Sequence, residues 1–345
     1  MLEDRVEAKW IDAFQQVMDL CAIDAGQSVA ILSETQSRSL NVQLAELALA
    51  RTEATYFHVT VPTPPQPGPA ILRSTGASTA LNGQAAAVSA LCGVDVVIDL
   101  TVEGLMHAPQ TAGILKSGTR ILNISNEHPD ALERCKPELS LMEDVKAAVK
   151  LCRGADAMTV TSDAGTDLTV NMDGASTVGV WGWTDRPGTL AHWPGGIVVS
   201  FPAAGSVNGR LVFQPGDMNL TFKRYFDSQV VFHLEDDYVT GIEGSGVDAR
   251  LMRDYLDAFG DKNAFATSHV GWGLNRAARY EALTMYDKRD CNGTELRAVA
   301  GNFLYSTGAN EFANRFTDGH FDLPMMGCTI RLDDRCVVEN GKLTS

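Results

Sequence analysis

The sequence predicts an α/β protein of two parts, an N-terminal doubly wound parallel sheet and a strand-rich C-terminal α+β part. Three observations lead to this class. Strand and helix patterns alternate over the first part of the chain, whereas short strands with Gly and Asp turns dominate the second. The 345 residues also exceed the roughly 250 to 300 residues at which one core stops growing. We place the two parts at 1–152 and 153–345.

The first part begins with an amphipathic helix, because apolar residues recur at helical spacing from Val6 to Cys21. Runs of β-branched and aromatic residues then predict buried strands, and the segments between them predict helices. This alternation implies parallel strands covered by helices on both faces. The proline-rich stretch 62–69 predicts a loop. We expect strands at 28–32, 54–61, 94–100 and 120–124, and helices at 41–51 and 109–116.

The second part is predicted to be a mixed or antiparallel assembly that carries a helix at 248–259, and a further helix, 142–153, runs up to the boundary between the two parts. Neither part contains GxGxxG or GxxxxGK[ST], so the doubly wound half has no signature for cradling phosphate. We expect strands within the segments MTVTSDAG, DLTVNMDG, GIVVSFPA, GRLVFQPG and SQVVFHLEDDYVTGIEG.

Charge and composition exclude several classes of partner. The chain has 43 acidic and 28 basic residues, a formal charge of -15, which disfavours nucleic acid and anionic membranes. No apolar run reaches the roughly 18 residues that a membrane span needs. The opening MLEDRVEAKWIDAF lacks the basic and apolar regions of a signal peptide. Seven scattered cysteines without a CxxC pair indicate free thiols, so we expect a cytoplasmic protein.

Two histidines and one aspartate form a candidate metal site. His320 and Asp322 stand two residues apart, so in an extended segment both side chains face the same side. His269 lies in a glycine-containing, strand-like segment that permits close approach of a ligand. Two His and one carboxylate form the facial triad that leaves positions open on iron(II). The alternative is a histidine at a strand end paired with a nearby aspartate.

Three further residues could serve a site. His107, after Met106, follows a predicted strand at the carboxyl edge where open α/β sheets bind ligands, although it could equally be a cap or a surface residue. His192 lies in the turn-like HWPGG, which could be purely structural. Ser306 lies at a strand end rich in hydroxyls, which often close turns. We interpret the other histidines as structural or surface residues: His58, His128 and His233.

With these segments in order, the sequence resembles the 2,5-dihydroxypyridine 5,6-dioxygenase family of nicotinic acid breakdown. The motifs that carry the resemblance are HWPGG, SHVGWGL, GNFLYSTG, HFDLP and IRLDDRCVV. The resemblance implies a single iron(II) held by His269, His320 and Asp322, the set already chosen from the residues themselves. It also places His107, His192 and Ser306 in the active site. Met106 departs from the leucine that is usual before the first of these histidines.

The implied reaction inserts both atoms of O2 into a small aromatic N-heterocycle and opens 2,5-dihydroxypyridine to N-formylmaleamate. His192 or His107 would move a proton, because a neutral imidazole suits that task near pH 7. Ser306 would orient the ring by a hydrogen bond, and Met106 would join these three residues in contacting the substrate. We also expect a homo-oligomer.

Two other functions stay open at this point. The chain more distantly resembles aminopeptidase T-type metallopeptidases, through the Pro-Gly-Gly turn, SVNGRLVF and the final HxD. That class uses glutamates for a second metal, whereas this chain has Ile197 and His269 at two of those positions, which favours a mononuclear iron site. The other alternative is a catalytically inactive binding protein that keeps the fold.

Overall fold

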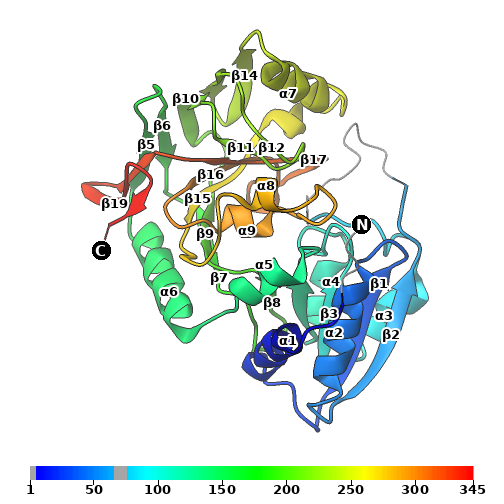
Figure 1. Cartoon of the computed structure of the whole chain (residues 1–345). Helices are drawn as coiled ribbons and strands as arrows, with labels where there is room; N and C mark the ends of the chain where they lie inside the picture. Colours follow the sequence, from blue (N-terminus) through cyan, green and yellow to red (C-terminus); the bar gives the residue numbers. More distant parts are fainter. Residues whose placement is uncertain (1–4, 66–75, 345) are drawn as a thin grey trace.

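Five parallel strands form the sheet of the first part in the computed structural model, which describes residues 5–65 and 76–344 (Figure 1). All four neighbouring pairs are parallel, as the alternation of strands and helices predicts. The strands in order across the sheet are β2 (Thr55–Val61), β1 (Ser28–Glu34), β3 (Val96–Leu100), β4 (Arg120–Ile124) and β8 (Leu190–Trp193).

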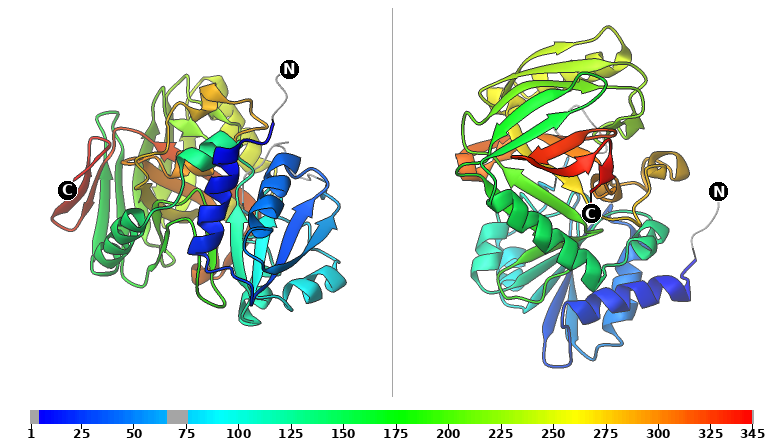
Figure 2. Two further views of the ribbon diagram at one scale, coloured as in Figure 1. Left: turned by 60° about the horizontal axis from the view of Figure 1, so that its bottom comes forward. Right: turned by 90° about the vertical axis from the view of Figure 1, so that its left-hand side faces the viewer.

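Helices cover both faces of this sheet, so the predicted doubly wound arrangement is confirmed (Figure 2). Val29 and Ile31 pack beneath the first two helices, whereas Ala30 and Leu32 pack beneath the next two. This division follows from the two-residue alternation of a strand. The helices of the first part are α1 (Ala8–Leu20), α2 (Ser39–Leu49), α3 (Ala85–Leu91), α4 (Thr111–Lys116) and α5 (Pro129–Arg134).

Helices α3 and α5 and strand β8 were not predicted, and one expected loop lies partly outside the described residues. Helix α3 was not expected, because its Ala-rich sequence shows no clear apolar stripe. Strand β8 lies where a turn was expected, and it extends the first sheet from beyond the predicted boundary at 152 and 153. Of the expected loop 62–69, residues 62–65 form no helix or strand, and the rest lies outside the described residues.

The second part consists of antiparallel sheets, in agreement with the expected strands. The larger one contains, in order, β14 (Tyr238–Glu243), β13 (Val230–Glu235), β10 (Val207–Phe213), β6 (Asp167–Asn171), β5 (Ala157–Thr161), β18 (Thr329–Leu332), β19 (Arg335–Glu339) and β20 (Lys342–Leu343). The smaller one contains β17 (Arg315–Met325), β16 (Phe303–Asn310), β15 (Thr267–Gly273), β9 (Ile197–Phe201) and β7 (Ser176–Val180). The shortest pair is β11 (Met218–Asn219) with β12 (Arg224–Tyr225).

The helices of this part begin with the two that the sequence predicts. Both contribute to the core that the two larger antiparallel sheets share. None of the helices within the described ranges combines the length and apolar character that a membrane span requires. The helices that pack with the second part are α6 (Leu139–Arg153), α7 (Val247–Asp257), α8 (Ala282–Met285) and α9 (Thr294–Arg297), with short 3-10 turns η1 (Lys262–Phe265) and η2 (Glu311–Ala313).

The alternation along β15, β16 and β17 decides where functional side chains can lie. Phe321 and Leu323 point into the shared core, and so do Val270 and Tyr305 on the neighbouring strands. The residues between them must therefore face the opposite side of this sheet. His320 belongs to the set that faces away from the core, and it lines the cavity described below.

Candidate active site

Strand register brings the three predicted metal ligands together. His269 on β15 is paired with Ser306 on β16, and Ser306 is paired with Asp322 on β17. Residues that are directly opposite one another in a sheet point to the same face. His320 precedes Asp322 by two residues and so joins that face, opposite Gly308. One row across three strands therefore gathers donors that are far apart in the sequence.

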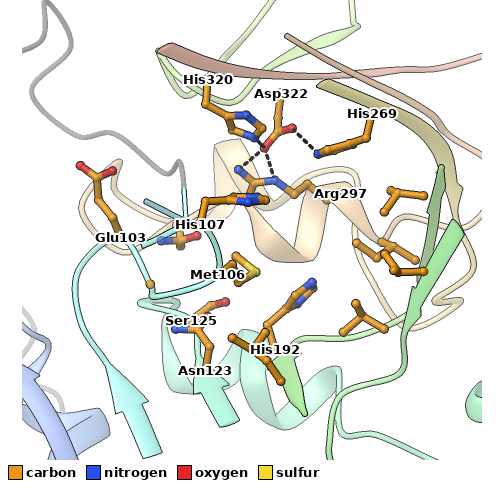
Figure 3. Close-up of a pocket in the computed structure, with 18 of the residues that line it drawn as sticks. Glu103, Met106, His107, Asn123, Ser125, His192, His269, Arg297, His320 and Asp322 are labelled. Atoms are coloured by element: carbon orange, nitrogen blue, oxygen red, sulfur yellow. Dashed lines mark hydrogen bonds and ion pairs between the residues drawn. The ribbon is translucent and has the colours of Figure 1, made fainter. Parts of the chain in front are cut away.

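The donor atoms of this triad lie close enough to bind one ion. All of them lie within 4.8 Å of one another, and the three side chains are buried (Figure 3). His320 Nε2 lies 3.2 Å from Asp322 Oδ2, and His269 Nε2 lies 3.8 Å from Asp322 Oδ1. His269 Nδ1 is buried without a hydrogen-bond partner in the described part of the chain. The protein thus leaves a nitrogen of this ring unsatisfied.

The protonation states suit a cation. Burial disfavours an ionised Asp322, but the Arg297 guanidinium and His320 outweigh it and hold the carboxyl pKa well below its usual value. Burial lowers the pKa of His269 to about 3, against the opposing pull of Asp322. A carboxylate and a neutral imidazole are the forms in which these side chains bind metals.

Two side chains fix the orientation of the Asp322 carboxylate. Arg297 donates from Nε to Asp322 Oδ2 at 2.6 Å, and its Nη2 lies at the same distance from that oxygen. Ser306 Oγ donates to the other oxygen, Oδ1. Neighbouring groups that orient a ligand in this way commonly tune the affinity of a metal site.

A cavity of about 240 Å³ opens beside the triad, a size that suits a small ligand rather than a polymer. The carboxyl ends of β3, β4 and β8 supply one wall, where an open parallel sheet is expected to bind ligands. Strands β7 and β9 supply an apolar wall opposite (Figure 3). The polar wall includes Thr101, Glu103, His107, Asn123, Ser125, His192 and Asn292, and the apolar one includes Val178, Val180, Ile197, Val199 and Phe201.

His107 and Met106 both line this cavity, as predicted. The His107 ring centroid lies 5.6 Å from that of His320. Their loop is shaped by Asp99 at the end of β3, which accepts hydrogen bonds from the N–H groups of Thr101 and Leu105 at 3.0 and 2.8 Å. Burial, with a smaller contribution from His320, lowers the pKa of His107 to about 4. The side chain is therefore neutral near pH 7.

His192 lines the cavity at the end of β8, and its tautomer follows from one contact. Its Nδ1 lies 2.7 Å from the carbonyl oxygen of Pro194, which can only accept a hydrogen bond. Nδ1 must therefore carry the proton. Burial lowers the pKa of His192 to about 4, although the Pro194 carbonyl opposes this. The neutral ring consequently keeps a lone pair on Nε2.

Ser306 lies behind Asp322 and is not among the residues that line the cavity. Its predicted contact with substrate stays a prediction, and the hydrogen bond to Asp322 gives it a visible role. The three histidines interpreted as structural lie elsewhere. His58 and His233 are partly exposed beside glutamates, and His128 caps α5 by accepting from the N–H of Asp130.

Sequence reasoning did not find Arg297, Asn123 or Asn292. Arg297 lies in TELR, which has no ligand spacing, and its partner Asp322 follows 25 residues later. Asn123 was counted only as a strand residue, and its amide reaches Asp99 at 2.8 Å. Its position at the carboxyl end of a parallel strand was the one available signal.

Known proteins are similar to this chain along nearly its whole length. The sequence pattern that defines the family described as NicX, 2,5-dihydroxypyridine 5,6-dioxygenase, matches residues 9–345. The chain belongs to this family. An enzyme of Pseudomonas putida KT2440 with that name is 36% identical over 343 residues, which cover 98% of this chain and 97% of the relative.

Solved structures agree with this family assignment. The structure of 2,5-dihydroxypyridine dioxygenase from Pseudomonas putida KT2440 superposes with a TM-score of 0.92 at 35% identity and covers 99% of both chains. AmpT from Thermus thermophilus superposes with a TM-score of 0.60 at 12% identity, covering 98% of this chain and 99% of its own. The second likeness shows a shared fold alone, in line with the more distant resemblance noted from the sequence.

Proposed function

We propose that this family member is a mononuclear iron(II) dioxygenase that opens 2,5-dihydroxypyridine to N-formylmaleamate. The observation that carries the proposal is the convergence of His269, His320 and Asp322 beside a small cavity that His107 and His192 also line. Family membership and the name of the relative support the same reaction.

The residues present fit iron(II). Two imidazoles and one carboxylate are the donors of the facial triad, and the close approach of their donor atoms and the ionised state of Asp322 agree with a bound cation. When bound, iron(II) would supply the electron exchange with O2 and adjacent positions for O2 and an electron-rich ring. Arg297 and Ser306 would hold the carboxylate ligand in one orientation.

The protein's own side chains then bind the ring and move its protons. The apolar wall would cover one face of the ring, and the polar wall would meet its hydroxyl and nitrogen edges. His192 would accept a proton from a ring O–H or N–H at Nε2, because Nδ1 is already committed to Pro194. His107, neutral and beside His320, is the second candidate for proton transfer.

Oxygen uptake with a panel of dihydroxypyridines tests this function. Protein purified without oxygen and loaded with iron(II) should consume one O2 per 2,5-dihydroxypyridine, with a formyl amide product. Protein that is folded and binds iron but consumes no O2 with any member of the panel would refute the proposal. Elemental analysis of the same samples links activity to metal content.

A dinuclear peptidase is the less favoured function. Ile197 lines the cavity where the peptidase-type resemblance expects a glutamate, and an aliphatic side chain supplies no metal ligand. Among the described residues, the one candidate group of three or more metal-binding side chains is the triad itself. Turnover of aminoacyl anilides with added zinc, cobalt or manganese would favour the peptidase instead.

We also propose a cytoplasmic location and a homo-oligomeric state. All seven cysteines are free thiols in the structure, which supports a reducing compartment. Fractionation of cells and light scattering of the purified protein test the two proposals separately. A monomer at micromolar concentration would contradict the second.

A further inference from the structure

Arg297, which also lines the cavity, places a positive charge directly beside the proposed ligand Asp322 (Figure 3). Two guanidinium nitrogens lie 2.6 Å from the same carboxylate oxygen, Oδ2, and the Arg297 side chain is only 11% exposed. A charge-assisted contact this short and this buried is weakly screened by solvent and salt. The guanidinium therefore affects how strongly this carboxylate can donate electrons, as well as how it is oriented.

The position of Arg297 is fixed by groups from the first part of the chain. Glu127, just after β4, accepts hydrogen bonds from the N–H groups of residues 292–294 at 2.8 Å each. Glu295, in the same segment, pairs with Arg134 of α5 at 2.7 Å. Because both anchors are buried carboxylates with several donors, the helix that ends at Arg297 is held as a built feature of the site.

We propose that Arg297 is a positioning residue that favours the divalent over the trivalent state of the metal held by Asp322 and the two histidines. The inference rests on the proposed function, since it presupposes iron in that site. In the oxidation concerned, one electron passes from the divalent metal to O2 and yields the trivalent metal and superoxide. A fixed cation beside the carboxylate ligand opposes a gain of positive charge on the metal, so the ferrous state would be retained more readily.

Arg297 would then influence the oxidation state of the metal as well as neutralise a buried aspartate. An iron(II) site that meets O2 without substrate can lose an electron and become inactive. A structural ion pair would stabilise the fold without changing the redox equilibrium of the metal. The two roles are therefore separated by a redox measurement on the folded, iron-loaded protein.

The test compares Arg297→Gln, which removes the charge, with Arg297→Lys, which keeps it. Each variant and the wild type are loaded with iron(II) without oxygen and poised with redox mediators at the midpoint potential of the wild type. The high-spin ferric signal in electron paramagnetic resonance reports the ferrous-to-ferric ratio. We expect this ratio to fall on the order of 10-fold or more in Arg297→Gln, and to stay near the wild-type value in Arg297→Lys.

Arg315→Gln is the matched control. Arg315 is also a buried arginine paired with an aspartate, since its Nη1 lies 2.8 Å from Asp237 Oδ2, and it does not line the cavity. This control should lose stability without changing the redox ratio. Arg297→Met, which keeps much of the aliphatic length without charge, is measured alongside and replaces Arg297→Gln if that variant does not fold.

The outcomes separate the inference from the function it rests on. A wild-type ratio in iron-loaded Arg297→Gln or Arg297→Met overturns the inference and leaves the proposed function intact. An equal fall in Arg297→Lys assigns the effect to shape rather than charge and also overturns it. A wild-type chain that binds no iron refutes the proposed function itself.

Discussion

Gly308 offers a sharp test of how the strands build the metal site. It lies opposite His320 in the β16–β17 pair, with φ +120, a backbone conformation that L side chains rarely adopt. A Cβ at this position would lie 2.2 Å from the carbonyl oxygen of Gly319 and 3.1 Å from the Cα of His320. Gly308→Ala should therefore displace the strand at the point where it presents the His320 ligand.

The magnitude follows from two separate effects. The unusual φ costs a non-glycine residue about 1–2 kcal/mol. The 2.2 Å contact falls about 0.8 Å short of the 3.0 Å that real Cβ contacts essentially never undercut, and its partner is backbone, so the strand must move. Disturbing the support of a metal ligand typically costs about 10- to 100-fold in affinity. We expect a loss of metal affinity in that range and a lower free energy of unfolding.

Gly118→Ala isolates the first effect. Gly118 has φ +98, and an added Cβ there would meet nothing within 4 Å, so only the backbone strain applies. Competition titrations with iron(II) under anaerobic conditions measure affinity, and urea denaturation of the metal-free proteins measures stability. Gly118→Ala should lose about 1–2 kcal/mol of stability and keep normal affinity. Wild-type metal affinity in Gly308→Ala would refute the argument that this strand contact sets the position of His320.

Three further predictions concern the site. Replacing His269, His320 or Asp322 with Ala should abolish the binding of about one iron per chain. Elemental analysis checks this, and two metals per wild-type chain would contradict it. His192→Ala and His107→Ala should keep iron but lose roughly 10² to 10⁴-fold in turnover. Oxygen uptake on the same samples decides, and near-normal turnover would mark that histidine as structural. Acid should destabilise the metal-free protein, because burial lowers the pKa of His192 to about 4. Below the unfolded pKa of about 6.5 only the unfolded chain gains this proton, so stability falls by on the order of 3 kcal/mol toward pH 4. Urea titrations of His192→Gln should show a flatter pH dependence, and an unchanged slope would exclude this histidine as the cause.

The convergence of the candidate triad could be predicted in part, because two of its residues are close in the sequence. His320 and Asp322 share a face whenever their segment is extended, and β17 is extended there. The sequence could not show that His269 lies in register with them, because pairing across β15, β16 and β17 is set by packing of the whole sheet. The third ligand, His269, was indicated by its residue type and by the family motifs.

Other features could not be predicted because their causes are remote in the sequence. Strand β8 is four residues long and joins a sheet whose other members end before residue 125. Such a short segment gains its conformation from pairing with β4 rather than from its own propensity. The position of Arg297 likewise depends on two residues that are remote in the sequence. Glu127 holds the segment just before it, and Asp322 accepts a hydrogen bond from its side chain. No local pattern records either contact.

The chemistry of this site depends on donors rather than on the fold that presents them. AmpT shares the fold at 12% identity, so the architecture itself is compatible with unrelated sequences. In this chain the apolar Ile197 lines the cavity and offers no metal ligand, and the neutral His269 belongs to the candidate triad. Arg297 places positive charge beside the single carboxylate of the triad, which lowers the negative charge available to cations there. We therefore expect a single divalent ion, because the one group of three metal-binding side chains within the described residues has a single carboxylate with a guanidinium beside it.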